Sequence, residues 1–314
     1  MSRALTFPGQ GSQAVGMGKS LSESFQSARE LFQEVDDALK QPLSRLMWQG
    51  PEVDLILTEN AQPALMAVSL AIMRVLEVEG NFVWGKHATL AAGHSLGEYS
   101  ALAATGAFTV SDAAKLLKAR GLAMQRAVPV GKGAMAALLG AEIAQAEEVS
   151  AEASMGNEVC CVANDNAPGQ VVISGHKAAV ERAAEISKTK GIKRAMMLPV
   201  SAPFHSPLMA PAAREMEDAL QKVQLKPPRV PIICNVSVSP ESDPTTIRRL
   251  LIEQVTARVR WRETIAGLAA RGITSVVEVG AGKVLTTMAK RIDKDLAALA
   301  IETPQEIEAF LKTL

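Results

Sequence analysis

Short apolar runs of strand length alternate with segments of helical periodicity along almost the whole chain. The runs lie at 3–7, 88–93, 230–236 and 275–280. The spacing of the other apolar residues predicts helices at about 20–40, 60–79, 96–106, 110–128, 206–223 and 304–313, with further helices between 236 and 275 and after the turn in "GAGKVLTT" at 280–287. Strands that are separated by helices pair in parallel, so this order predicts an α/β architecture built on a parallel sheet.

The order of predicted strands and helices changes between residues 130 and 200. There the segments follow one another as "AMAALLG", a helix at 142–154, "EVCCVA", "QVVISG", a helix at 176–190 and "KRAMMLPV". This β-α-β-β-α-β order is that of the ferredoxin-like split unit. Proline and glycine cluster at both ends of the stretch. We therefore expect a discontinuous larger domain at 1–129 and 200–314, with a ferredoxin-like subdomain at 130–199 inserted into it.

Composition narrows the class of protein. The 314 residues include 33 Lys and Arg against 33 Asp and Glu, so no net charge favours nucleic acid or acidic lipid. The three cysteines, two of them adjacent, form neither a disulfide framework nor a C-x-x-C metal pattern. The first residues lack a signal-peptide h-region, and no apolar run approaches the roughly 20 residues of a membrane span. We expect a cytoplasmic monomer that holds no metal and binds neither nucleic acid nor a membrane.

The stretch "GHSLG" at 93–97 carries the pattern G-x-S-x-G between the apolar run at 88–93 and the helix expected at 96–106. In that position the pattern is typical of a nucleophile elbow, a turn so sharp that only glycines fit around the serine. The hydroxyl of Ser95 would then be exposed, and the following helix would direct its N-terminal amides at the reacting oxygen. The alternative is a glycine-rich loop packed at the end of a buried strand.

A serine nucleophile needs a base, and the chain has four histidines. His87 lies eight residues before Ser95, roughly 26 Å away along an extended strand. His94 is adjacent to Ser95 in a turn that separates neighbouring side chains, and His176 opens a helix like a solvated first-turn residue. His205 lies between two prolines in "SAPFHSP", which stiffen its loop. We expect His205 to be the base, with His176 as second choice and with a backbone carbonyl or an amide side chain orienting the imidazole.

One arginine lies on the apolar side of its helix. At about 100° per residue, Arg120 falls among the apolar residues of the helix at 110–128, opposite most of the other polar side chains. A buried guanidinium needs an anion, and the same helix offers none nearby. Two interpretations stay open: a buried pair with Glu98 or Glu278, or a site that grips a substrate carboxylate bidentately.

Four motifs occur in order along the chain: "FPGQGSQ" at 7–13, "GHSLGEYSALAA" at 93–104, Arg120 in its helix, and "PVSAPFHSPLM" at 199–209. Together they resemble those of the malonyl-CoA:acyl carrier protein transacylase family, and the likeness runs nearly end to end. The resemblance implies an α/β-hydrolase-like core with a ferredoxin-like insert. It also implies an acyltransferase that moves the malonyl group from malonyl-CoA to the phosphopantetheine thiol of acyl carrier protein for fatty acid synthesis, without a cofactor.

The resemblance assigns roles to individual residues. It implies that Ser95 accepts the malonyl group and that His205 is its base, while Arg120 clamps the free carboxylate. The remaining roles belong to the main chain. The amides of Gln10 and Leu96 would form the oxyanion hole, and the carbonyl of Gln254 would orient the imidazole.

Phe204 departs from the family pattern, because many bacterial members carry a small residue before the histidine. Related synthase acyltransferases with phenylalanine there tend to favour malonyl over methylmalonyl units. A bulky ring would crowd an α-branch, so we expect Phe204 to contribute to acyl specificity.

Two other functions stay open at this point. One is a serine esterase or thioesterase on the same elbow, and the other is a catalytically silent module that binds carrier protein. A buried arginine favours the transferase, since simple esters offer it no carboxylate. Carrier proteins of this pathway are acidic, so we expect one of two basic patches to dock the partner. The patches are Arg258, Arg260 and Arg262, and Lys190, Lys193 and Arg194.

Overall fold

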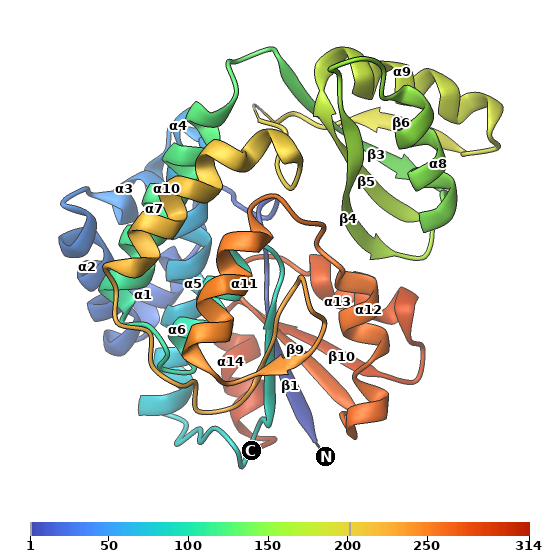
Figure 1. The fold of residues 1–314 in the computed structure, drawn as a ribbon. Helices are drawn as coiled ribbons and strands as arrows, with labels where there is room; N and C mark the ends of the chain where they lie inside the picture. The colour runs from blue at the N-terminus through green and yellow to red at the C-terminus, as the bar shows by residue number, and fades with distance from the viewer. Residues whose placement is uncertain (1, 201) are drawn as a thin grey trace.

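A six-stranded sheet forms the centre of the larger part of the protein (Figure 1). We describe it from a computed structural model, which covers residues 2–200 and 202–314; Met1 and Ser201, both within the expected larger domain, lie outside the described residues. The strand order is β10-β9-β1-β2-β7-β8, and every pair is parallel except β7 with β8. The strands are β1 Arg3–Phe7, β2 Leu90–Gly93, β7 Ile232–Ile233, β8 Pro240–Glu241, β9 Ser275–Val279 and β10 Ala297–Ile301.

Side-chain alternation along the strands divides the core into two layers. In β1, Leu5 and Phe7 pack on one face of the sheet, whereas Ala4 packs on the other. The smaller layer contains two helices, α12 Trp261–Ala266 and α13 Val284–Ile292. The larger layer contains α1 Lys19–Ser24, α2 Gln26–Leu39, α3 Leu43–Gln49, α4 Glu52–Leu55, α5 Thr58–Val78, α6 Gly97–Ala104, α7 Val110–Ala127, α10 Ala210–Gln221, α11 Pro244–Gln254 and α14 Pro304–Leu311.

Helix α5 is the long apolar helix of the larger layer. Its 21 residues have the length and hydropathy of a membrane span, contrary to the expectation that no apolar run approaches that length. However, 83% of its most apolar window is buried inside the protein, where it packs against α2, α6 and α7. Its hydrophobicity is therefore that of a helix buried between the sheet and other helices.

A second sheet of four strands lies beside the first, with its helices on the outer side (Figure 1). Its order β4-β5-β3-β6, antiparallel throughout, is that of a ferredoxin-like unit, as the sequence predicts. The helices cover one face, and the other face turns Met135, Ala137 and Val172 toward the larger sheet. The elements are β3 Gly133–Leu139, α8 Ile143–Ala153, β4 Cys160–Ala167, β5 Gln170–His176, α9 Lys177–Thr189 and β6 Arg194–Met197.

Several elements differ in detail from the sequence predictions. The helix expected at 20–40 is two helices, because Phe25 between them is extended. The helix expected at 206–223 begins as a short 3-10 turn, η1 Pro207–Met209, before α10. The strand expected at 230–236 is regular for only two residues before the chain turns back into β8. Strands β8 and β10, helices α3 and α4 and the 3-10 turn η2 Ala269–Arg271 have no counterpart in the predictions.

Candidate active site

Ser95 lies in the sharp turn between β2 and α6, as the G-x-S-x-G pattern predicts. A side chain at Gly93 would overlap the Gly97 backbone, and one at Gly97 would overlap the carbonyl of Phe7 on β1. Both positions therefore require glycine for the close approach of strand and helix. Ser95 itself has φ of 53°, in the left-handed region that non-glycine residues rarely adopt. The turn thus has the strained geometry of a nucleophile elbow.

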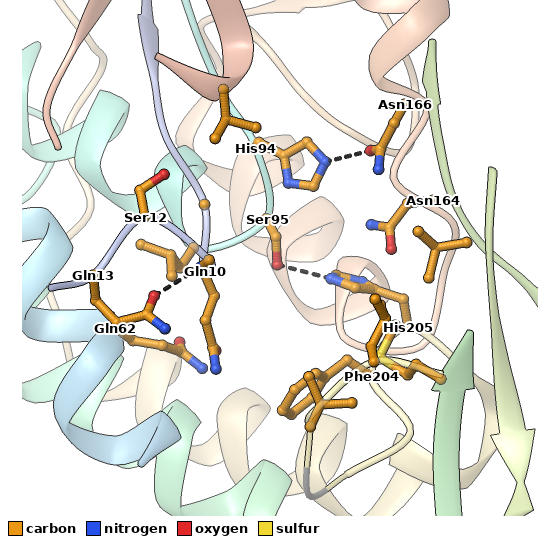
Figure 2. Close-up of a pocket in the computed structure, with 18 of the residues that line it drawn as sticks. Gln10, Ser12, Gln13, Gln62, His94, Ser95, Asn164, Asn166, Phe204 and His205 are labelled. Atoms are coloured by element: carbon orange, nitrogen blue, oxygen red, sulfur yellow. Dashed lines mark hydrogen bonds between the residues drawn. The ribbon is translucent and has the colours of Figure 1, made fainter. Parts of the chain in front are cut away.

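His205 meets Ser95 from the loop that follows the four-stranded sheet. Its Nε2 lies 2.7 Å from the Ser95 Oγ (Figure 2). Its Nδ1 lies 2.9 Å from the carbonyl oxygen of Gln254 and 3.1 Å from that of Ala257. Two carbonyl acceptors require Nδ1 to carry the proton, so Nε2 is free to accept one from the serine hydroxyl.

The environment of His205 keeps its imidazole neutral. Burial and the positive charge of Arg120 lower the pKa of His205 to about 3, and the bonds to the two carbonyls only partly oppose them. A neutral imidazole is the form that accepts a proton from a serine hydroxyl. The protonation state of His205 therefore suits it to take the proton of the Ser95 hydroxyl at neutral pH.

The other three histidines lie away from the Ser95 hydroxyl. His94 lines the same cavity, but its Nε2 bonds to the Asn166 Oδ1 at 2.8 Å and its ring packs on Trp261. His176, our second choice, ends β5 and accepts a hydrogen bond from the Val159 amide, so it is tied to the four-stranded sheet. His87 accepts one from the Val83 amide in a surface turn.

Arg120 is 1% exposed and its guanidinium reaches the serine. The Nη2 donates to the Ser95 Oγ at 3.2 Å and to the Gln254 Oε1 at 2.9 Å, and the Nη1 donates to the Gln62 Oε1 at 2.9 Å. The face of the guanidinium lies over the Tyr99 ring. Each of these three acceptors is thus neutral, and the Arg120 Nε has no hydrogen-bond partner within the described residues.

Neither of the two glutamates considered as partners forms an ion pair with Arg120. The Glu278 carboxylate accepts hydrogen bonds from the amides of Leu285 and Thr286 at the start of α13. Glu98 is closer, but its Oε2 accepts from the Gln254 Nε2 at 2.9 Å, and the Gln254 amide separates it from the arginine. The buried cation therefore lacks a directly bound anion in residues 2–200 and 202–314.

The side chains of Ser95, Arg120 and His205 line one cavity of about 530 Å³ between the two sheets. Gln10, which precedes a turn, and Leu96, which follows the serine, also line it, and neither amide donates a hydrogen bond to another described group. Phe204 lies beside His205, while Asn164 projects from β4 on the facing wall (Figure 2). Six of the seven residues assigned roles above therefore line the cavity, and the seventh, Gln254, contacts His205 through its carbonyl.

Sequence reasoning missed three buried polar residues of this region: Gln62, Asn235 and the side chain of Gln254. Gln62 directly precedes the largely apolar stretch 63–73 of α5 and is buried with it. Asn235 directly follows the apolar "VPIIC" at the carboxyl end of a parallel strand, where ligand sites of open α/β sheets lie. Each could have been found by asking which polar residues interrupt a buried segment. No group of His, Cys, Asp and Glu that could hold a metal occurs in the described part of the chain.

Comparisons with known proteins agree with this arrangement. The family model described as acyl transferase domain matches residues 5–303. The malonyl CoA-acyl carrier protein transacylase of Bacillus subtilis (strain 168) is 43% identical over 311 residues, which cover 99% of this chain and 96% of that protein. The crystal structure of acyl-carrier-protein-S-malonyltransferase from Bartonella henselae has a TM-score of 0.97 at 55% identity, covering 100% of this chain and 99% of that one.

A further solved structure holds a malonyl-transacylase in complex with its type II PKS acyl-carrier protein. It has a TM-score of 0.96 at 40% identity and covers 100% of both chains. The protein is thus an α/β acyltransferase with a serine in its nucleophile elbow. Within that class, the chain belongs to the malonyl CoA-acyl carrier protein transacylase family.

Proposed function

We propose that this protein transfers the malonyl group from malonyl-CoA to the phosphopantetheine thiol of acyl carrier protein, and so supplies fatty acid synthesis. The observation that carries the proposal is the meeting of Ser95, His205 and Arg120 around one cavity, with the arginine unpaired. A nucleophile and its base account for acyl transfer. An unpaired buried cation beside them accounts for an acyl group with a free carboxylate.

The reaction proceeds in two half-reactions through a malonyl-serine. In the first, the Ser95 Oγ attacks the thioester carbonyl and gives its proton to the His205 Nε2, and the imidazolium then protonates the departing CoA thiolate. In the second, His205 takes the proton of the carrier thiol as its sulfur attacks the acyl-serine carbonyl, and the imidazolium returns that proton to the departing Ser95 Oγ. The amides of Gln10 and Leu96 stabilise the oxyanion of each tetrahedral intermediate, and the Gln254 carbonyl holds the imidazolium.

Intact mass spectrometry tests the proposal. Brief exposure to malonyl-CoA should add one malonyl group to the protein, and holo acyl carrier protein should then remove it. The Ser95→Ala variant is the control and should stay unmodified. Equal labelling of that variant would contradict the assignment of Ser95 as the acyl acceptor.

A serine hydrolase on the same elbow is the first rival function. The two differ in whether water attacks the acyl-serine, so release of CoA is measured with and without carrier protein. Slow release in the absence of the acceptor supports the transferase. Fast release without it supports a thioesterase.

A silent module that binds carrier protein is the second rival. A serine-directed acylating or phosphonylating reagent should label Ser95 in an active protein, because the His205 Nε2 lies 2.7 Å from its hydroxyl. Absence of labelling at Ser95 would favour the silent module.

Acyl carrier protein is the expected partner, and the ion pairs of the two basic patches bear on our choice between them as its docking site. In the first basic patch, Arg258, Arg260 and Arg262 form ion pairs with Glu147, Glu263 and Asp165. In the second, Lys190 pairs with Glu148 and Glu152, whereas Lys193 and Arg194 are exposed and form no ion pair with a described residue. We therefore favour the second patch, and binding should weaken as salt increases.

The remaining expectations stay proposals. We propose a catalytic domain at 1–129 and 200–314 with a ferredoxin-like subdomain at 130–199, and a cytoplasmic monomer that binds no membrane. Light scattering coupled to size exclusion would measure the oligomeric state.

A further inference from the structure

Asn235 lies beneath the nucleophile elbow, directly after β7 on the neighbouring strand. It is 1% exposed and does not line the cavity. Its Oδ1 accepts a hydrogen bond from the Ser95 amide at 2.7 Å, and its Nδ2 donates to the Gly93 carbonyl at 2.6 Å. One carboxamide thus joins both sides of the turn that carries the serine.

The elbow needs these two hydrogen bonds because its backbone is strained. Ser95 has φ of 53°, and its amide precedes α6, where amides have no intrahelical acceptor. A buried amide without a partner would cost about 1–3 kcal/mol. A carboxamide presents an acceptor and a donor side by side, so Asn235 satisfies the Ser95 amide and the Gly93 carbonyl together.

The backbone of Asn235 makes a second connection, toward Arg120. Its amide donates to the Glu98 Oε2 at 2.9 Å, and the Gln254 Nε2 donates to the same oxygen at 2.9 Å. Because the Gln254 nitrogen faces the carboxylate, its Oε1 faces the Arg120 Nη2 at 2.9 Å. The main-chain carbonyl of Gln254 accepts from the His205 Nδ1. The nucleophile, the base and the arginine are thus all joined to one buried network.

We propose that Asn235 is a positioning residue for acyl transfer: its side chain fixes the Ser95 hydroxyl relative to the His205 Nε2 and the oxyanion amides. The proposal rests on the proposed function, in which Ser95 is the acyl acceptor. Asn235 acts through the elbow and does not touch the substrate. Its loss should therefore slow the chemical step more than it weakens substrate binding.

The Asn235→Ala variant tests this in steady-state malonyl transfer. We expect kcat to fall about 100-fold with less than about a threefold change in KM for malonyl-CoA, the cost of misplacing a reacting group by about 1 Å. The matched control is Thr105→Val, which removes another buried hydrogen bond, from the Thr105 Oγ1 to the Ala101 carbonyl at the end of α6. A purely structural role predicts equal kcat in the two variants once both are shown to be folded, and that result would overturn the proposal.

The Asn235→Asp variant provides a second readout in the pH profile. The new carboxyl group reproduces the donor and acceptor of the carboxamide only when it is protonated. Burial next to Glu98 raises the pKa of such a group, because both desolvation and a neighbouring carboxylate disfavour its charge. We expect kcat of this variant, relative to the wild type, to rise as pH falls. A constant ratio across the range in which both proteins stay folded would contradict the proposal.

A substrate-independent assay separates this inference from the proposed function. A fluorophosphonate reacts with an activated serine whatever the natural acyl donor is. If the wild type is labelled at Ser95 but transfers no malonyl group, the proposed function fails. The inference is still tested, because Asn235→Ala should slow labelling by a similar factor while Thr105→Val should not.

Discussion

The protein holds two clusters of charge, each around a buried carboxylate, that differ in one respect. At the seam, which we define as the contact of Asp165 in β4 with Arg262 in α12, the ions are paired. Arg262 donates three hydrogen bonds to the Asp165 carboxylate at 2.8–3.0 Å. At the cavity floor, defined as Ser95, Glu98, Arg120 and Gln254, the arginine and the carboxylate are separated by an amide. The arginine of the seam binds a carboxylate directly, whereas the arginine of the floor does not.

We propose that this difference separates a structural ion pair from a binding site. A buried charge that exists for stability would be expected to have its counter-ion, as Asp165 has in Arg262, because a lone buried charge is costly. At the floor, the Arg120 Nε and the Glu98 Oε1 lack hydrogen-bond partners within the described residues. The strongest interaction available to Arg120 is therefore with an anion that enters the cavity.

Removal of the floor arginine should have the largest effect. We expect Arg120→Ala to lower malonyl transfer by roughly 30- to several-thousand-fold, since loss of a bidentate charged contact in a dry pocket costs about 2–5 kcal/mol. Acetyl transfer should be spared or increased, because acetyl has no carboxylate. Initial rates with malonyl-CoA and acetyl-CoA measure the ratio. An equal loss on both substrates would reject the clamp.

Removal of the seam arginine should instead cost stability. We expect Arg262→Ala to lower the free energy of unfolding by about 2–3 kcal/mol, below the usual range for a broken buried pair because the Arg262 side chain is 32% exposed. The ratio of malonyl to acetyl transfer should not change. Urea denaturation together with the same two rate measurements would check both points, and a shifted ratio would mean that the seam also shapes the site.

The sequence predicts the buried arginine of the floor but not the ion pair of the seam. Arg120 was recognisable because one charged residue stands in an apolar helical stripe, and local periodicity is enough to detect that. The Arg262–Asp165 pair joins α12 to β4, which are 97 residues apart, and both residues read as ordinary surface charges. Which distant elements pack together is decided by the tertiary fold, so the pairing of the first basic patch could not be foreseen.

The same limit applies to the fold and the polar network. Periodicity and turn residues predicted the parallel sheet and the ferredoxin-like insert, because both depend on local patterns of apolar residues. The strand β10 was missed, although it pairs in register with β9 over its whole length. The network through Asn235, Glu98 and Gln254 links three elements that only the sheet order brings together, so no spacing along the chain reveals it.

His205, the base next to the floor, should make the stability of the protein sensitive to acid. The pKa of His205 is lowered to about 3, against an ordinary value of 6.5, so between these values the unfolded protein binds more protons than the folded one. Stability from the neutral imidazole is therefore complete above pH 6.5 and is lost as pH falls. We expect the wild type to lose about 2 kcal/mol more than His205→Asn between pH 7 and pH 5.

Urea denaturation of the two proteins across that pH range measures the difference. His94, whose pKa is also lowered by burial, is present in both and cancels. Parallel stability curves for the two proteins would show that His205 is not held neutral in the folded state.

The smallest expected effect concerns the wall of the cavity above the floor. Phe204 lines the cavity next to His205 and packs against apolar residues of both the six-stranded and the four-stranded parts. Replacing its benzyl side chain with a methyl group leaves room beside the acyl carbon, and one extra methyl group on a substrate alters specificity by at least about tenfold. We expect Phe204→Ala to raise transfer of methylmalonyl relative to malonyl by about tenfold, with Arg120 still holding either carboxylate.

A matched variant shows whether acyl specificity depends on the position of the Phe204 ring or only on the volume of the cavity. Leu198 is another apolar side chain of the cavity wall, contributed from the segment after β6, and Leu198→Ala enlarges the cavity at a different point. Competition between the two acyl-CoA substrates gives the ratio for each variant. If both variants relax the preference equally, specificity reflects total cavity volume. If only Phe204→Ala does so, the floor selects the carboxylate while the ring next to the base selects against the α-branch, and the two determinants are independent.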